Sequence, residues 1–230
     1  PRSEEQEAVV PVTREVEDTT PVPIAERRLW TNRGSRILKV RKGRKVKLHN
    51  DPRGKVVAQV RAKTDFGSPR TMAVLDRDGE WIQVSSAEAK DNRPLWVRAS
   101  YKDFIFQTTP MKIMVNLGDR EVRLIDGSKQ VAKFPVTIGA GGTSTPPGRF
   151  GVTDVFTGGL NPAYGCCAIA LSAHQPNLPP GWIGGDRVAI HGTTGPVGGA
   201  ESSGCIRAAN PNAMKLVNKV PLGTPVIVVS

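Results

Sequence analysis

The sequence predicts a mainly β protein with one short helix. Glycine and proline, 24 and 19 of the 230 residues, approach a fifth of the chain, which favours turns and short strands over helices. Apolar and polar residues alternate in short runs along most of the sequence, as they do in half-buried strands. A single helical stripe occurs, formed by Ala213, Leu216, Val217 and Val220. The length allows two small β domains, each with its own core.

The first domain is expected at residues 28–108, after a tether at residues 1–27. The tether is predicted to be flexible because it mixes Glu, Pro, Thr and Val with few large apolar groups. Strand-like runs then follow at regular spacing: Arg36–Val40, Lys45–Leu48, Val56–Val60, Met72–Leu75, Trp81–Val84 and Trp96–Val97. Such spacing is typical of a small barrel. The pattern resembles the bacterial SH3-like domains that accompany cell-wall enzymes, with Trp81 and Trp96 interpreted as packing residues.

The second domain is expected at residues 109–230. Its strand-like runs are Lys112–Leu117, Glu121–Ile125, Val131–Ile138, Phe150–Phe156, Cys166–Leu171, Asp186–Ile190 and Val226–Val229. The runs at 139–148 and 175–185 are rich in Gly and Pro and predict long loops, and loops of that length are often functional. Asn210 followed by Pro211 predicts a helix start, with Asn as the cap and Pro at the first position. Pro221 ends that helix.

Positive charge is concentrated in the first domain. The net charge is +11, and nine Lys or Arg residues fall between Arg28 and Lys47 with no acid among them. This predicts a polyanionic partner. Nucleic acid is not expected, since Trp30 is the one aromatic residue in the segment and no stacking motif accompanies it. Anionic cell-wall polymer or a lipid surface suits an exported protein better, and a solvated basic face without a partner remains the alternative.

The candidate active site lies in the stretch from His191 to Arg207, which reads His-Gly-Thr-Thr-Gly-Pro-Val-Gly-Gly-Ala-Glu-Ser-Ser-Gly-Cys-Ile-Arg. An imidazole that accepts the proton of a cysteine turns a weak nucleophile into a thiolate. His191 would be delivered by the strand before it, and Gly204 would let backbone N–H groups approach a reacting carbonyl next to Cys205. We therefore predict Cys205 as nucleophile and His191 as base.

This stretch resembles the active-site signature of the YkuD-type L,D-transpeptidases. The resemblance extends upstream through Met111–Phe150, which includes the Thr-Pro-x-Gly-x-Phe turn beginning at Thr145, and covers roughly the C-terminal half of the chain. It implies a β-sandwich catalytic domain. It also implies that the carbonyl of Gly192 orients His191, and that the N–H groups of Gly204 and Cys205 form the oxyanion hole. The usual second His of the signature is Ser203 here.

Four further residues are candidates for substrate contact. These are Tyr164, Ser203, Arg207 and Thr193. For Arg207 a role in bracing the loop and a role in meeting a substrate carboxylate are both open, with the brace favoured. For Tyr164 simple packing is the alternative.

The implied activity is peptidoglycan L,D-transpeptidation without a cofactor or metal. The thiolate attacks the third residue of a tetrapeptide stem, expels the terminal D-Ala and holds a thioester, which a neighbouring stem amine resolves as a 3→3 cross-link. Carbapenems are the implied inhibitors, and cell-wall biogenesis and cell shape are the implied processes. Water or a protein amine as acceptor would instead give an L,D-carboxypeptidase or a lipoprotein transferase. A non-catalytic wall-binding protein also stays open, whereas a cysteine peptidase of the NlpC/P60 type is disfavoured because it places Cys before His.

The remaining cysteines and histidines are assigned lesser roles. Cys166 and Cys167 are adjacent and are interpreted as small buried residues, with an adjacent-residue disulfide as the alternative. His49 is expected to be exposed beside a turn, and His174 is expected in a polar loop with nothing to orient its ring. No run of eighteen apolar residues occurs, so no membrane span is expected in this sequence. We expect an extracytoplasmic protein, held in the cell wall or by an anchor upstream.

Overall fold

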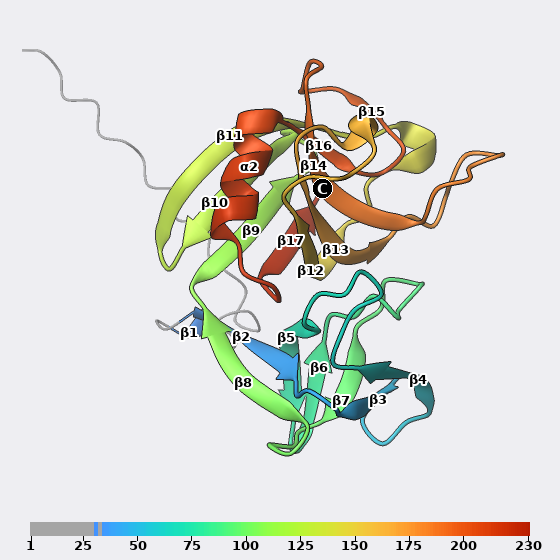
Figure 1. The fold of residues 1–230 in the computed structure, drawn as a ribbon, viewed down its shortest axis with the longest axis vertical. Coiled ribbons are helices and arrows are strands. Elements are labelled where there is room, and N and C mark those ends of the chain that lie inside the picture. The colour runs from blue at the N-terminus through green and yellow to red at the C-terminus, as the bar shows by residue number, and fades with distance from the viewer. Residues whose placement is uncertain (1–29, 32–33) are drawn as a thin grey trace, which may run out of the picture.

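The computed structural model describes residues 30–31 and 34–230. They form two β sheets, and in Figure 1 the N-terminal sheet lies in the lower part of the molecule and the C-terminal sheet in the upper part. The tether predicted at residues 1–27 lies outside the described residues. In the part of the chain that is described, no helix is long and apolar enough to cross a membrane.

The first sheet is antiparallel and has the strand order β1-β2-β5-β6-β7-β3-β4. Strand β8 lies outside this order and also pairs with β2. Its strands are β1 (Trp30–Thr31), β2 (Gly34–Val40), β3 (Lys45–His49), β4 (Val56–Arg61), β5 (Thr71–Asp78), β6 (Trp81–Val84), β7 (Leu95–Arg98) and β8 (Phe104–Thr109). Alternation places one face of β3 in the core, where Val46 and Leu48 are buried, while Lys45 and Lys47 point to solvent.

The second sheet closes on itself. Its order is β10-β9-β17-β12-β13-β14-β16-β11, β10 pairs again with β11, and β15 adds to the other side of β11. The strands are β9 (Met111–Asn116), β10 (Glu121–Asp126), β11 (Lys129–Gly139), β12 (Gly148–Phe156), β13 (Ala168–His174), β14 (Arg187–Thr193), β15 (Ala200–Ser202), β16 (Ile206–Ala209) and β17 (Pro225–Val229). Two 3₁₀ turns, η1 (Gly141–Thr143) and η2 (Pro162–Tyr164), interrupt its loops.

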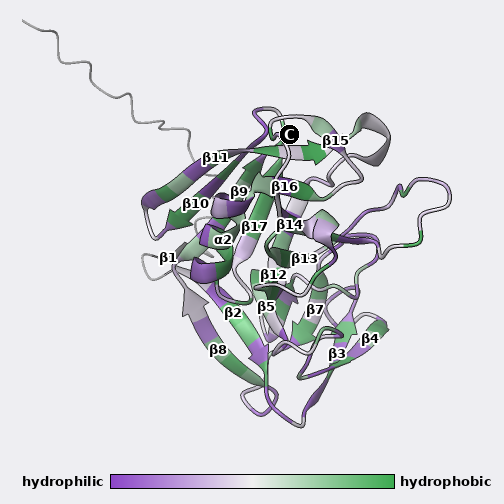
Figure 2. Cartoon of the chain, turned by 45° about the horizontal axis from the view of Figure 1, so that its top comes forward, coloured by the Kyte–Doolittle hydropathy of each residue, from purple (hydrophilic) through white to green (hydrophobic). Residues whose placement is uncertain are grey.

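Helix α2 (Asn210–Lys219) covers β13, β14 and β16. It buries Ala213, Leu216 and Val217 in the C-terminal core, which is separate from the N-terminal core around Leu38, Leu48 and Phe104. Figure 2 shows apolar residues recurring along the strands of both sheets. The helix start differs from the expectation. Ala209 is the N-cap, Asn210 is already helical, and no side chain caps the helix.

The mainly β class with one α-helix of 10 residues in the described chain agrees with the sequence-based expectation. The predicted sandwich takes the form of the closed C-terminal sheet. Strand β8 was missed, because the expected series ended at β7, and the short strands β15 and β16 were missed inside the Gly-rich stretch. The SH3-like likeness and the domain boundaries at 27 and 108 stay predictions.

Candidate active site

Cys205 lies in the tight connection between β15 and β16, and Ser202 shapes this connection. The Ser202 hydroxyl donates to the carbonyl of Cys205 at 2.5 Å and accepts the N–H of Gly204 at 3.1 Å. Gly204 has a φ of +110°, and a Cβ there would lie 2.1 Å from the side-chain nitrogen of Gln175. Glycine is therefore required at this position both by the backbone and by the space available.

His191 and Cys205 face the same side of the C-terminal sheet. Strands β14 and β16 are parallel neighbours that pair His191 with Arg207 and Ile190 with Ile206. Cys205 is thus level with Ala189, two residues before His191 on the neighbouring strand. Because side chains alternate with a period of two, the imidazole and the thiol point to the same face.

The orientation of the imidazole is fixed by its own loop. His191 is 4% exposed, and its Nδ1 lies 2.9 Å from the carbonyl oxygen of Gly192. A carbonyl only accepts, so Nδ1 carries the proton and Nε2 is the unprotonated nitrogen of the neutral ring. The rings of Tyr164 and His191 pack edge to face with their centroids 5.0 Å apart. These contacts hold the imidazole in one orientation and one tautomer, as a general base requires.

His191 and Cys205 both line a cleft of about 410 Å³, a size that suits a small molecule or peptide. Three of the four predicted substrate residues, Tyr164, Ser203 and Arg207, line this cleft. Thr193 does not line it, and its hydroxyl accepts the N–H of Gly195 at 3.0 Å. The remaining wall comes mainly from the loop after β13, with Gln175, Leu178, Gly181, Trp182, Ile183, Gly184 and Gly185, and is completed by Asn161, Ala163, Asp186, Arg187, Val188 and Ser202.

Comparison with known proteins identifies this arrangement. The family model described as the L,D-transpeptidase catalytic domain, YkuD, matches residues 110–228. The chain belongs to this family. The matched segment contains the whole cleft, the Thr145 turn and α2.

Named relatives match about half of the chain. The chain is 32% identical over 121 residues to "Putative L,D-transpeptidase YkuD" of Bacillus licheniformis, and 29% identical over 123 residues to the protein of the same name in Bacillus subtilis. These matches cover 52% and 53% of this chain and 66% and 67% of the relatives. A solved L,D-transpeptidase from Stackebrandtia nassauensis shares 18% identity with a TM-score of 0.40, covering 54% of this chain and 57% of the other.

Burial keeps both reactive groups of this L,D-transpeptidase domain neutral at rest. Burial lowers the pKa of His191, Arg207 adds to that lowering, and the backbone carbonyls of Gly192 and Tyr164 oppose it. Burial raises the pKa of the Cys205 thiol, while the backbone near Ala189 and the charge of Arg207 oppose that rise. The two directions favour a thiol and a neutral imidazole as the resting forms of Cys205 and His191. The proton must move as the thiol attacks.

The two N–H groups that are predicted to form the oxyanion hole differ in their contacts, and their role stays a prediction. The N–H of Gly204 donates to Ser202 and is therefore engaged. For the N–H of Cys205, the structure records no hydrogen bond within the described residues. Cys205 is thus the remaining backbone donor of the predicted pair, and Gly204 acts through its conformation.

Thr145 ties the Thr-Pro-Pro-Gly turn to the nucleophile connection. It is 2% exposed, its hydroxyl donates to the carbonyl of Gly204 at 2.9 Å, and it accepts the N–H of Gly139 at 3.0 Å. Sequence reasoning quoted this turn as a family feature but gave Thr145 no role. Its partner lies 59 residues away, so no local pattern signalled it.

Asn210 contacts Cys166 and lies beside Gly192 instead of capping α2. Its side-chain oxygen accepts the N–H of Cys166 at 3.1 Å, and it would lie 2.3 Å from a Cβ on Gly192. Gly192 therefore fits where a larger residue would collide. Cys166 and Cys167 are joined by a disulfide, the alternative that the sequence left open, and Cys205 is the free cysteine.

The other two histidines differ from their expectations. His49 is half-buried, with Nδ1 at 2.8 Å from the Gly54 carbonyl and its ring against Trp81. His174 ends β13 and is 1% exposed, and both of its ring nitrogens have partners. Among residues 30–31 and 34–230, no group of three or more His, Cys, Asp or Glu side chains could hold a metal ion.

Proposed function

We propose that this protein is a peptidoglycan L,D-transpeptidase that acts through a Cys205 thioester. The observation that supports the proposal best is the shared cleft, in which Cys205 and the oriented imidazole of His191 stand on one face of β14 and β16. Membership of the YkuD family adds the reaction class.

In the first half-reaction, Nε2 of His191 takes the thiol proton as the sulfur of Cys205 attacks the carbonyl carbon of the third stem residue. The Cys205 N–H is the donor available for the negative charge that develops on the carbonyl oxygen. The tetrahedral intermediate then breaks its C–N bond, and the imidazolium returns its proton to the departing amine of D-Ala. The product is a thioester on Cys205.

In the second half-reaction, the side-chain amine on the third residue of a neighbouring stem attacks the thioester. His191 accepts a proton from that amine and passes it to the departing sulfur, so the thiol is regenerated and an amide joins the two stems. Water in place of the amine yields a tripeptide stem, and an amine of a protein yields an attached lipoprotein.

Arg207 is proposed to meet a substrate carboxylate. Arg207 lines the cleft, and no hydrogen bond or ion pair is recorded for its side chain within the described residues. A bracing role, which the sequence favoured, would need such partners. A charged donor facing a cleft suits a stem-peptide carboxylate.

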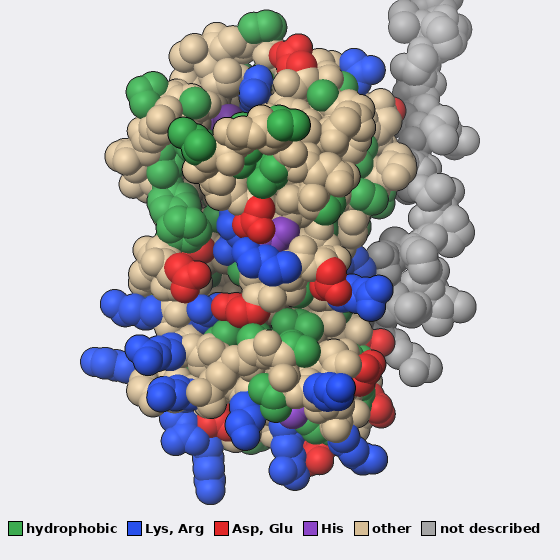
Figure 3. Space-filling view, turned by 90° about the vertical axis from the view of Figure 1, so that its right-hand side faces the viewer, with side chains coloured by type: hydrophobic (Ala, Val, Ile, Leu, Met, Phe, Trp, Pro, Cys, Tyr) green, Lys and Arg blue, Asp and Glu red, His purple; other side chains and the backbone are tan. Residues whose placement is uncertain are grey.

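We propose an extracytoplasmic location and binding of anionic wall polymer through the first sheet. In the basic segment, the residues that the structure describes as exposed cations are Arg36, Arg41, Lys42, Arg44, Lys45 and Lys47. Figure 3 shows Lys and Arg side chains gathered over the lower half of the molecule. Arg44 pairs with Asp103 at 2.7 Å, but most of these cations face solvent without such a partner being recorded.

The mass of the product formed from a tetrapeptide muropeptide tests the function. The wild-type chain should yield a dimer lighter by one D-Ala than two substrates, and Cys205→Ala should yield none. A tripeptide product would indicate a carboxypeptidase. Acylation by a carbapenem, mapped by peptide mass, is expected on Cys205, while an adduct on Cys166 or Cys167, or none, would contradict the assignment.

A further inference from the structure

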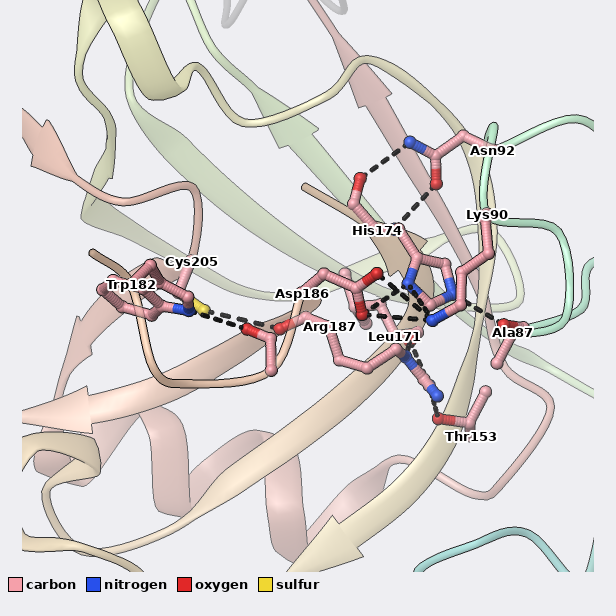
Figure 4. Close-up of polar contacts among 11 residues, drawn as sticks. Ala87, Lys90, Asn92, Thr153, Leu171, His174, Trp182, Asp186, Arg187 and Cys205 are labelled. Carbon is pink, nitrogen blue, oxygen red and sulfur yellow. Dashed lines mark hydrogen bonds and ion pairs between the residues drawn. The ribbon is translucent and has the colours of Figure 1, made fainter. Parts of the chain in front are cut away.

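A polar junction around the buried ring of His174 joins the first half of the chain to the rim of the catalytic cleft. His174, at the end of β13, places Nε2 at 2.6 Å from the carbonyl of Ala87 and Nδ1 at 2.9 Å from a carboxylate oxygen of Asp186. Lys90 adds Nζ at 3.2 Å from the same carboxylate. Figure 4 shows His174 and Asp186 meeting Ala87 and Lys90, which come from the loop between β6 and β7.

The same loop also holds the backbone of His174. The side-chain amide of Asn92 donates to the His174 carbonyl at 2.8 Å and accepts the His174 N–H at 2.7 Å. One amide thus satisfies both backbone groups of a buried residue, as a neighbouring strand would. The first half therefore fixes the ring and the main chain of His174 together.

One route from this junction to the nucleophile passes through Arg187. Asp186 directly precedes Arg187, whose carbonyl oxygen faces the Cys205 sulfur at 3.9 Å. The Arg187 guanidinium donates to Thr153 at 2.7 Å and to the carbonyl of Leu171. The start of β14 is thereby fixed at both the backbone and the side chain, and the thiol rests against it (Figure 4).

A second route passes through Gln175, the residue after His174. Its N–H donates to the carbonyl of Asp186 at 2.7 Å, and its side-chain nitrogen donates to the carbonyls of Thr143 and Ser144 at 2.9 Å each. The same side chain packs against Gly204, beside the nucleophile. Both routes start at His174 and Asp186; the first ends at the sulfur of Cys205 and the second at its neighbour Gly204.

We propose that His174 and Asp186 are positioning residues for Cys205, held in place by the loop 87–92 of the first half. The inference rests on the proposed function in taking Cys205 as the nucleophile. It makes the first half a structural part of the catalytic centre in addition to any binding role. Its physical basis is that a thiol displaced by a fraction of an ångström loses the alignment that acyl transfer needs.

The experiment uses the full chain and follows the alkylation of Cys205 by iodoacetamide against pH, with the adduct located by mass spectrometry. Asp186→Asn and His174→Ala should alter the pH profile of alkylation and slow carbapenem acylation by about tenfold to 100-fold. In turnover with muropeptide they should lower kcat more than they raise KM. Asp91→Asn is the matched control, because Asp91 lies in the same loop and its recorded ion pair is an exposed one with Arg93.

Lys90 gives a variant that is expected to fold, since its side chain is 69% exposed. Lys90→Met should slow acylation by up to about fivefold, the range of an exposed ion pair, and Lys90→Arg should restore the rate. Lys102→Met, another exposed lysine of the first half, serves as its control.

Unaltered alkylation profiles and acylation rates in folded Asp186→Asn and Lys90→Met would overturn the inference, even if their stability fell. Failure of the proposed function looks different. Wild-type protein would then form no cross-linked, hydrolysed or protein-linked product, while the alkylation profiles of the variants would still shift.

Discussion

The Thr145 hydroxyl provides a sharp test of how the nucleophile connection is held. Thr145→Val keeps the side-chain shape and removes the oxygen, which leaves the Gly204 carbonyl and the Gly139 N–H without their partner. Each buried hydrogen bond is worth about 1 kcal/mol, so the free energy of unfolding should fall by about 2 kcal/mol. For a chain of this size, that loss lowers Tm by about 4–8 °C. Because one of the two bonds ends on Gly204, acylation of Cys205 should slow as well.

Thermal and urea unfolding of the full chain measure the first effect, and stopped-flow acylation by a carbapenem measures the second. Ser144→Ala is the matched control, because its exposed hydroxyl makes only long contacts of 3.3 and 3.2 Å to Ala140 and Gly141. That variant should stay within about 0.5 kcal/mol of wild type. A Thr145→Val protein as stable and as reactive as Ser144→Ala would refute the reasoning.

Three further outcomes are expected. The acidic limb of the kcat/KM profile should have its midpoint below 6.5, because burial lowers the pKa of His191. The ring must be neutral to accept a proton, so activity is lost as the pH falls through that lowered pKa. A midpoint above 6.5 in a pH titration would contradict this. Arg207→Gln should raise KM for stem peptide by about tenfold or more through loss of a charge-assisted bond, while Lys215→Gln on α2 should not. Binding to anionic wall polymer should weaken as salt is raised, since charges are screened over about 10 Å at 0.1 M. It should also weaken when the exposed cations of Arg36–Lys47 are neutralised. Salt-independent binding would remove that proposal.

Local patterns predicted most strands. They also led to the prediction of His191 as base and Cys205 as nucleophile. The alternation in Lys45–Leu48 and the His-Gly-Thr and Gly-Cys-Ile-Arg segments needed no knowledge of distant residues. The contact between the ring of His191 and the carbonyl of Gly192, the next residue, was implied by the family resemblance.

Long-range contacts account for the features that sequence reasoning missed. His174 was assigned to a polar loop with nothing to orient its ring, because its partners Ala87 and Asn92 are 87 and 82 residues away. Asn210 was read as a helix cap from its neighbour Pro211, but its side chain instead binds Cys166, 44 residues earlier. In both cases a local rule was outweighed by a tertiary contact that satisfies a backbone group.

Ser203 marks the departure from the family signature, and the structure gives two opposing effects for Ser203→His. Burial raises the pKa of Cys205, so an added imidazole could favour the thiolate, at about 1.4 kcal/mol for each pKa unit. Against this, Ser203 lines the cleft beside Gly204, where a ring would compete with substrate and crowd a packed connection at a cost of about 1–3 kcal/mol.

The crowding effect should balance or exceed the gain, because His191 and its Gly192 carbonyl already provide a complete base. We therefore expect the acylation rate of Ser203→His to be unchanged or lower. Single-turnover acylation kinetics measure it, with Ser203→Asn as a control that adds bulk without a titratable ring. A rise of tenfold or more in Ser203→His alone would show that the base of this chain is incomplete without a second histidine.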